Sequence, residues 1–164
     1  MEIPTVDSTG LSKPELYASL RDSAAALFRG ERNAIANAAN LSALIWHSLP
    51  DLNWAGFYLW DGSELVLGPF QGKVACIRIG LGRGVCGRAA QERRTQVVAD
   101  VHRFAGHIAC DPDSRSEVVV PLLAGGRLLG VLDLDSPRAE RFDAEDAAGL
   151  EALARVWVEA CDHR

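Results

Sequence analysis

The sequence predicts an α+β fold in which a mostly antiparallel sheet carries helices on one face. Apolar residues recur at helical spacing near both ends of the 164-residue chain, which indicates amphipathic helices there. The middle of the chain contains short alternating segments separated by glycine turns, a pattern typical of antiparallel hairpins. Because helices and strands are grouped along the chain rather than alternating regularly, the α+β class is favoured.

Two helices are expected before the first strand. The segment Ser12–Glu15 has the pattern of a capping box with proline in the first turn, so a helix should run from there to about Phe28. A second helix is expected over residues 31–48, where an apolar stripe is formed by Ile35, Ala38, Leu41 and Ile45. Both helices are amphipathic, so they should cover one side of a sheet.

Strands and one short helix fill the middle of the chain. The first strand, 53–60, places Trp54, Gly56 and Tyr58 on one face. The other strands are expected over 64–67, 74–79, 96–99, 117–123 and 128–135, with a short helix over 85–92. A final helix should begin after Asp143, a good N-cap residue, and Cys161 falls on its buried stripe.

The longest predicted loop covers residues 100–116 and is followed by acidic strand residues. Irregular segments of this length in compact domains are usually functional. Asp133 and Asp135 share one face of the last strand, and the register of the last hairpin decides whether Glu117 joins them. A two-residue turn at Gly125–Gly126 would put Glu117 on the other face, whereas a three-residue turn would pair it with Asp135. The sequence leaves both registers open.

Composition and charge exclude several classes of function. The net charge of −5 argues against a nucleic-acid partner, and no apolar run approaches the ~20 residues needed to cross a bilayer. The start of the chain has neither the basic nor the apolar segment of a secretory signal. We therefore expect a cytoplasmic protein without nucleic-acid or membrane partners. In that compartment cysteines stay reduced unless they are catalytic, sensing or metal-bound.

Cys76, Cys86 and Cys110 lie within a stretch of 35 residues and are the main indication of chemistry. They suggest redox chemistry in which one thiolate attacks and a second thiol resolves. Cys110 lies in the long polar loop, just before a turn rich in aspartate, which places it at a surface rather than in a core. His107 and Arg115 are near it in sequence and would favour its thiolate. The alternative is that the cysteines are inert buried side chains, which is common for free cysteine.

Two further patterns are weaker indications of function. Residues 82–87 match the G-x-G-x-x-G pattern of dinucleotide sites, but the helix that follows is too short for the usual crossover, which favours a tight turn instead. His102, His107 and Cys110 could bind zinc with another cysteine as the fourth ligand, but their spacing matches none of the familiar paired-ligand patterns. We therefore expect no metal and no cofactor.

The three cysteine contexts together make the chain resemble the free methionine-(R)-sulfoxide reductases, which are single GAF-domain enzymes. The similarity covers about residues 12–160 and departs at Ala105, where the family usually has proline. It implies one GAF domain over residues 1–164, with a ligand pocket on the sheet face opposite the helices. It is densest in the segments 53–59, 67–79, 82–87, 107–111, 116–121 and 130–136.

The resemblance implies a redox reaction with a role for each residue. Cys110 would attack the sulfoxide sulfur, and the sulfenic acid left on it would condense with a resolving thiol, preferably Cys76 and otherwise Cys86. Glu117 and Asp135 would protonate the leaving oxygen, because two neighbouring carboxyls resist double ionisation. Thioredoxin would then restore the thiols by exchange, so that the enzyme repairs oxidised free methionine.

The resemblance and the aromatic face of the first strand also suggest how a free amino acid binds. Trp54 and Tyr58 would form an aromatic wall with room at Gly56 for the thioether methyl, and Asp133 would hold the ammonium. A pocket that grips both ends of the amino acid would exclude methionine within a peptide. The carboxylate would be received, by family resemblance, by the backbone N–H groups of Ile108, Ala109 and Cys110.

GAF domains more often bind small molecules for signalling than catalyse reactions, so a ligand-sensing module is the alternative function. Such modules generally sit beside an output domain and a connecting helix, and only a few residues follow the last predicted helix here. GAF domains frequently dimerise through their helices, so a homodimer is compatible with the resemblance. The preference for the (R) epimer rests on the resemblance alone.

Overall fold

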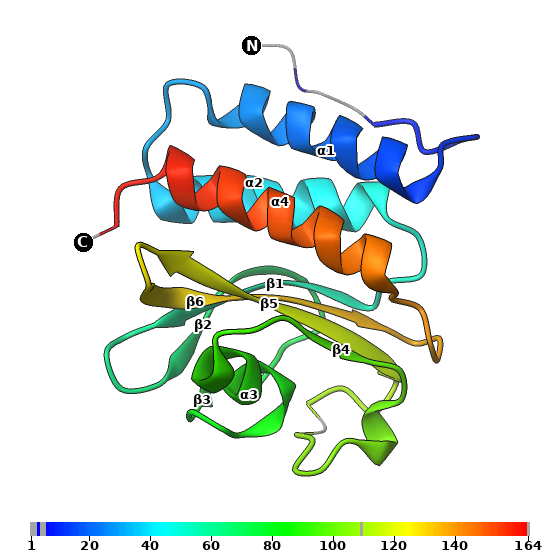
Figure 1. The fold of residues 1–164 in the computed structure, drawn as a ribbon, viewed down its shortest axis with the longest axis vertical. Helices are drawn as coiled ribbons and strands as arrows, with labels where there is room; N and C mark the ends of the chain where they lie inside the picture. Colours follow the sequence, from blue (N-terminus) through cyan, green and yellow to red (C-terminus); the bar gives the residue numbers. More distant parts are fainter. Residues whose placement is uncertain (1–2, 4–5, 109, 164) are drawn as a thin grey trace.

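The computed structural model describes residues 3, 6–108 and 110–163. In these residues a six-stranded antiparallel sheet separates a group of three helices from a smaller layer of loops and one short helix (Figure 1). The elements are α1 (Lys13–Phe28), α2 (Ala34–Ser48), β1 (Trp54–Trp60), β2 (Leu65–Gly72), β3 (Arg78–Ile79), α3 (Gly84–Glu92), β4 (Gln96–Val98), a 3-10 turn (Val101–Arg103), β5 (Ser116–Ala124), β6 (Arg127–Ser136) and α4 (Ala144–Ala160). The strand order is β3-β2-β1-β6-β5-β4, so β1 and β6 lie at the centre of the sheet.

The helices α2 and α4 form a layer on the sheet, and α1 packs on these two helices rather than on the strands (Figure 1). The N-terminal ends of α1 and α4 are held by capping boxes. The Ser12 hydroxyl accepts from the Glu15 N–H at 3.3 Å in the predicted capping box, and Asp143 forms a second capping box with Asp146. The buried Tyr17 hydroxyl donates to Asp146 Oδ1 at 2.7 Å and ties α1 to α4. The core under this layer includes Leu20, Leu41, Ile45, Phe57, Leu132, Leu150 and Trp157.

The second helix differs from its prediction in two details. It begins at Ala34 rather than near residue 31, because Asn33 is its N-cap and accepts from the Ala36 N–H at 2.9 Å. Ile35 is expected on the apolar stripe but is 53% exposed, because the side of the first turn that packs against the core is the one that carries Ala34. The rest of the stripe is buried as predicted, at Ala38, Leu41 and Ile45.

The segment predicted as a third strand is mostly a loop. Strand β3 is limited to Arg78–Ile79, whereas β2 continues beyond its predicted end to Gly72. The physical reason is that the chain at Cys76 turns towards β1, where the Tyr58 hydroxyl donates to the Cys76 carbonyl oxygen at 2.8 Å. The prediction of a strand over residues 74–79 is therefore wrong for residues 74–77 and correct only for the last two residues.

The register of the last hairpin, which the sequence left open, brings the carboxyls to one face. The turn has two residues, Gly125 and Gly126. Glu117 nevertheless pairs with Asp135, because a β-bulge at Leu122–Leu123 places one extra residue in β6. The bulge therefore has the effect that was expected only of a three-residue turn.

A glycine is required where β6 passes β1 just after this bulge. Gly130 has a φ of +154°, and a Cβ there would collide with the Tyr58 carbonyl oxygen. A larger residue would push the two central strands apart. The close approach of β1 and β6 keeps their pocket-facing side chains in one compact group.

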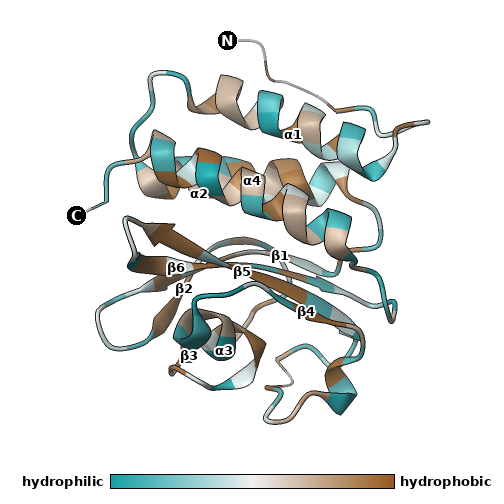
Figure 2. Ribbon diagram, viewed as in Figure 1, coloured by the Kyte–Doolittle hydropathy of each residue, from teal (hydrophilic) through white to brown (hydrophobic). Residues whose placement is uncertain are grey.

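The second face of the sheet is covered by α3 and by the segment between β4 and β5. Its apolar cluster includes Val85, Cys86, Ala89, Val101, Val119 and Val131. Figure 2 shows hydrophobic residues along β5 and β6, between the two layers, and hydrophilic residues on the outer sides of the helices. None of the described helices is long and apolar enough to cross a membrane. The predicted α+β architecture, with helices on one face, is confirmed.

Candidate active site

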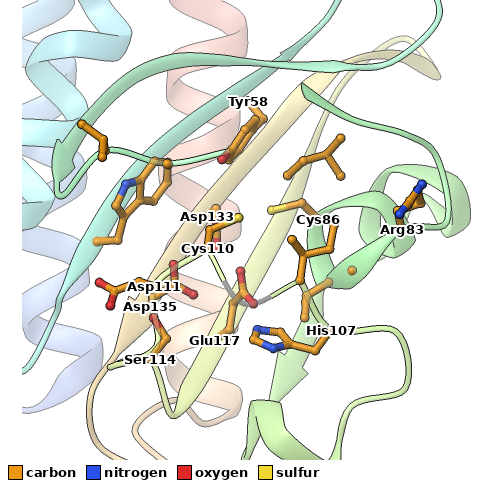
Figure 3. Close-up of a pocket in the computed structure, with 17 residues that line it drawn as sticks. Tyr58, Arg83, Cys86, His107, Cys110, Asp111, Ser114, Glu117, Asp133 and Asp135 are labelled. Carbon is orange, nitrogen blue, oxygen red and sulfur yellow. The ribbon is translucent and has the colours of Figure 1, made fainter. Parts of the chain in front are cut away.

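A small cavity of about 50 Å³ lies on the α3 side of the sheet (Figure 3). Its lining includes Trp54, Tyr58, Cys86, Ile108, Cys110, Glu117, Asp133 and Asp135. Figure 3 shows the sulfurs of Cys86 and Cys110 and the three carboxyl groups turned towards one common space. Of the described residues predicted for the site, Cys76 alone is not part of this lining. Ala109, also predicted, lies outside the described residues.

Cys76 is instead joined to Cys110 by a disulfide. The two Cα atoms are 5.9 Å apart, and the residues are 34 positions apart in sequence. Cys76 comes from the loop between β2 and β3, whereas Cys110 comes from the long loop before β5. The fold therefore places two of the three clustered cysteines within bonding distance, which their sequence positions alone did not establish.

The loop that carries Cys110 is fastened to the start of β1. The Asn53 side-chain amide donates to Asp111 Oδ2 at 3.0 Å and to Ser114 Oγ at 2.9 Å. The N–H of Cys110 donates to the Ile108 carbonyl oxygen at 3.0 Å. In this disulfide state, one of the three N–H groups expected to receive a substrate carboxylate is thus engaged within the loop itself.

Three carboxyl groups from β5 and β6 lie beside the disulfide, where Glu117 and Asp133 are buried and Asp135 is partly buried. Glu117 pairs with Asp135 across the hairpin, and Asp133 lies on the same face of β6. Burial, followed by the negative charges of Asp133 and Asp135, raises the pKa of Glu117 well above its usual range. Burial and the charge of Asp133 likewise raise the pKa of Asp135 well above its usual range. The cluster therefore holds protons at pH values where isolated carboxyls are ionised.

Asp133 differs from its two neighbours. Burial raises its pKa as well, but hydrogen bonds with Glu117 and Cys86 oppose that effect. Its Oδ1 atom is buried and has no hydrogen-bond partner among the residues that the structure describes. Buried polar atoms are nearly always paired in native proteins. Asp133 therefore offers the cavity an acceptor that a bound cationic or N–H group could satisfy.

Cys86 is a buried free thiol near the start of α3. Burial, and then the charges of Asp133 and Glu117, raise its pKa, so the thiol is protonated at neutral pH and is a poor nucleophile. The Cys86 sulfur and one oxygen each from Asp133 and Glu117 lie within 4.8 Å of one another. Among the described residues, these three atoms are close enough together to bind one metal ion. This set differs from the histidine-containing set that the sequence suggested.

The aromatic wall predicted on β1 is present, but the room beside it is not. The rings of Trp54 and Tyr58 are stacked with centroids 5.7 Å apart. Phe70 of β2 stacks on Trp54 at 5.1 Å, and a Cβ on Gly56 would collide with the Phe70 Cβ. Gly56 therefore allows β2 to come close and does not leave space for a substrate methyl group.

The basic residues expected beside Cys110 contribute less than the sequence suggested. His107 lines the cavity, but partial burial and the charge of His102 lower its pKa, so it is neutral at pH 7. Arg115 is exposed and is not part of the lining. Arg83, the N-cap residue of α3, lines the cavity although the sequence did not single it out.

Comparisons with known proteins agree with this geometry. The GAF domain family matches residues 18–157. The free methionine-R-sulfoxide reductase of Escherichia coli (strain K12) is 52% identical over 143 residues, which is 87% of each chain. The protein of the same name in Saccharomyces cerevisiae is 46% identical over 162 residues, covering 94% of this chain and 90% of that one. This chain belongs to the free methionine-R-sulfoxide reductase family.

A solved structure extends the comparison with this family to three dimensions. The X-ray structure of the free methionine-R-sulfoxide reductase from Neisseria meningitidis, in complex with its substrate, is 41% identical and matches with a TM-score of 0.92. The match covers 97% of this chain and 95% of that one. The family resemblance and the GAF fold expected from the sequence are confirmed.

Two polar residues that organise the site in this free methionine-R-sulfoxide reductase chain were not predicted. Asn53 opens the densely matching segment 53–59, and Ser114 follows Asp111 in a turn-forming sequence. The sequence indicates a motif at Asn53 and a turn at Ser114, and it does not indicate that the two residues are partners. Their hydrogen bond joins residues 61 positions apart, so no local pattern could have indicated it.

Proposed function

We propose that this protein reduces free L-methionine (R)-S-oxide to L-methionine. The observation that carries the proposal is the disulfide between Cys76 and Cys110 beside a cavity with proton-holding carboxyls. Such a disulfide is the product expected when one thiol attacks an oxidised substrate and a second thiol resolves the intermediate. The family to which the chain belongs supports the choice of substrate.

Substrate binding uses the aromatic wall and the unpaired acceptor. Trp54 and Tyr58 pack against the apolar part of the amino acid, and Asp133 accepts a hydrogen bond from its ammonium. The carboxylate is received by the backbone of the loop from Ile108 to Cys110, as the family resemblance implies. Contacts to both charged ends restrict the site to the free amino acid.

In the chemical step, the Cys110 thiolate attacks the sulfur of the sulfoxide. The acid pair of Glu117 and Asp135 supplies the proton that the sulfoxide oxygen needs before it can leave sulfur. The protonated oxygen then passes from the substrate sulfur to the Cys110 sulfur as the bond between the two sulfurs breaks, so that Cys110 becomes a sulfenic acid and methionine is released. The sulfoxide is thereby reduced by two electrons, and the Cys110 sulfur is oxidised by two.

The sulfenic acid is then resolved by Cys76, whose thiol displaces water and forms the disulfide. Cys86 takes no part in thiol exchange in this scheme, because its raised pKa keeps the thiol protonated. Thioredoxin reduces the disulfide by thiol exchange and completes the cycle in the cytoplasm. The chain acts as one GAF domain over residues 1–164, and a homodimer formed through the helices is compatible with this scheme.

A coupled assay tests the proposal directly. The protein is mixed with thioredoxin, thioredoxin reductase and NADPH, and NADPH consumption is followed with the free (R) epimer, the free (S) epimer or a peptide that contains methionine sulfoxide. Only the free (R) epimer should be consumed.

Cysteine variants complete the test of the proposed function. Cys110→Ser should lose turnover, whereas the matched variant Cys161→Ser, altered at a buried thiol at the end of α4, should retain it. Absence of turnover with either free epimer would favour the ligand-sensing alternative.

A further inference from the structure

Two apolar side chains are exposed on either side of Cys76. Val74 is 89% exposed and Ile77 is 67% exposed, although the sequence predicted a regular strand at both positions. Val74 has the highest exposure among the large hydrophobic residues in the described part of the chain. Contiguous exposed apolar residues often mark an interaction site. Here they bracket a cysteine that must exchange with an external thiol.

The backbone holds these side chains outward. The Tyr58 hydroxyl donates to the Cys76 carbonyl at 2.8 Å, and the Leu67 N–H donates to the Ile77 carbonyl at 2.8 Å. Because both carbonyls are bonded to the sheet, the loop cannot readily rotate to bury its apolar residues. Their exposure is therefore a fixed property of the fold.

A hollow of about 720 Å³ adjoins this loop. The segment that precedes Cys76 contributes Lys73, and the segment that follows Cys110 contributes Asp111 and Pro112. Trp46 and Pro137 add apolar surface. The hollow therefore lies where the two cysteine-bearing segments meet.

The charges beside this surface are balanced, because two ion pairs lie there and the hollow is also lined by one further acid and one further base, Asp111 and Arg115. Lys73 binds Asp113 at 3.0 Å, and Arg78 binds Glu64 at 2.9 Å. These ion pairs leave little net charge for a partner to match. The contact offered is mainly apolar.

The two disulfide sulfurs are placed differently with respect to the cavity. Cys110 lines the cavity, whereas Cys76 does not, although its neighbours Val74 and Ala75 reach the rim. Cys76 is partly exposed and lies outside the cavity lining, in the loop that carries the exposed Val74 and Ile77. An incoming thiol can approach it without entering the substrate cavity.

We propose that Val74, Ile77 and the adjoining hollow form the docking surface for a dithiol protein whose reactive cysteine lies in an apolar surface, and that this protein attacks Cys76. The proposal rests on the proposed function, which forms the disulfide in each cycle. The partner's thiolate bonds to Cys76, the Cys76–Cys110 bond breaks, and Cys110 leaves as a thiolate that takes up a proton. The partner's second thiolate then attacks its own first sulfur and releases Cys76. The enzyme gains two electrons, and the partner becomes a disulfide.

The size of the surface fits this occupant better than a second copy of the chain. A reductant must dissociate after every turnover, and redox encounters use small interfaces, below about 1,200 Å² in total. A permanent partner at the same place would cover the loop that carries Cys76 and prevent its reduction. Two exposed side chains and a shallow hollow are suited to a brief contact.

The test compares Ile77→Glu with Ile35→Glu, the same substitution at an exposed isoleucine of the opposite layer. Turnover is measured with thioredoxin and separately with dithiothreitol, a small dithiol that needs no docking surface. Ile77→Glu should raise the KM for thioredoxin at least about tenfold, because a charge is placed in an apolar contact. Its rate with dithiothreitol should be unchanged, and Ile35→Glu should match the wild type with both reductants.

A trapping experiment identifies the attacked sulfur. Thioredoxin in which the second cysteine is replaced by serine is mixed with the oxidised protein, and the mixed disulfide is located by peptide mass analysis. Attachment at Cys76 supports the proposal, and attachment at Cys110 overturns it. An unchanged KM in Ile77→Glu, or a change in its oligomeric mass by light scattering, also overturns it. Single-turnover formation of the Cys76–Cys110 disulfide with methionine sulfoxide tests the proposed function separately, because it needs no reductant.

Discussion

Replacing Glu117 with glutamine should slow the reaction and, at the same time, stabilise the fold at neutral and alkaline pH. The side chain is 6% exposed and lies beside Asp133 and Asp135, so its charged form is disfavoured. Loss of a general acid typically costs about 10²–10⁴-fold in rate. Glutamine resembles the protonated carboxyl in shape but cannot donate that proton, so substrate affinity should change much less than the rate.

The stabilisation has a defined sign. The pKa of Glu117 is raised in the folded protein, so the folded state keeps a proton that the unfolded chain releases above about pH 4.3. The contribution of this group to stability is complete below that pH and is lost as the pH rises through the folded-state pKa. Over that interval the wild type should lose up to about 1.4 kcal/mol per pH unit relative to the variant.

Urea unfolding of the disulfide forms, repeated at several pH values, measures this difference. The two proteins should have similar free energies of unfolding at acidic pH, and the variant should become progressively more stable as the pH rises. The matched control is Glu159→Gln, the same substitution at an exposed glutamate of α4, which should show no such pH-dependent gain in stability. A gap between Glu117→Gln and the wild type that does not widen with pH would refute the buried-proton argument.

Three further substitutions probe other parts of the site. Cys76→Ser should allow one turnover and leave a sulfenic acid on Cys110, which dimedone labelling and mass analysis would detect; a full steady-state rate would contradict the resolving role. Asn53→Ala should release the Asp111 loop and slow single-turnover methionine formation about 10- to 100-fold, as measured by rapid quench, and an unaltered rate would show that the loop needs no anchor. Gly130→Ala should lower the free energy of unfolding by about 1–3 kcal/mol because of overpacking, and an unchanged urea midpoint would argue against the close strand approach.

Local signals in the sequence predicted most of the fold. The capping box at Ser12 and the N-cap at Asp143 depend on residues three positions apart, so their pattern is visible without tertiary information. The prediction of the third strand was wrong because two tertiary bonds hold the Cys76 loop away from a regular strand. These are the hydrogen bond from the Tyr58 hydroxyl and the disulfide to Cys110. The exposure of Ile35 depends on which side of the first turn of α2 the core covers, and the local apolar spacing does not determine that.

The candidate site was predicted in composition but not in arrangement. The resemblance indicated both Cys110 and Cys76, and the alternation along β6 placed Asp133 beside Asp135 on one face. The pairing of Glu117 with Asp135 depends on a bulge between β5 and β6, which the spacing of residues in the sequence does not reveal. The space expected at Gly56 was filled by a strand whose length was underestimated.

The bulge in the last hairpin has a consequence for tolerated changes of chain length. Hairpin tips usually accept insertions and deletions, because their residues are solvated and make few contacts. Here, deletion of the extra β6 residue opposite Leu122–Leu123 would shift the pairing of β5 and β6 by one residue. Glu117 would then point away from Asp135, to the apolar face of the sheet under the helices. Deletion of one residue far from the reacting sulfurs would thus abolish activity, although every catalytic residue would still be present in the chain.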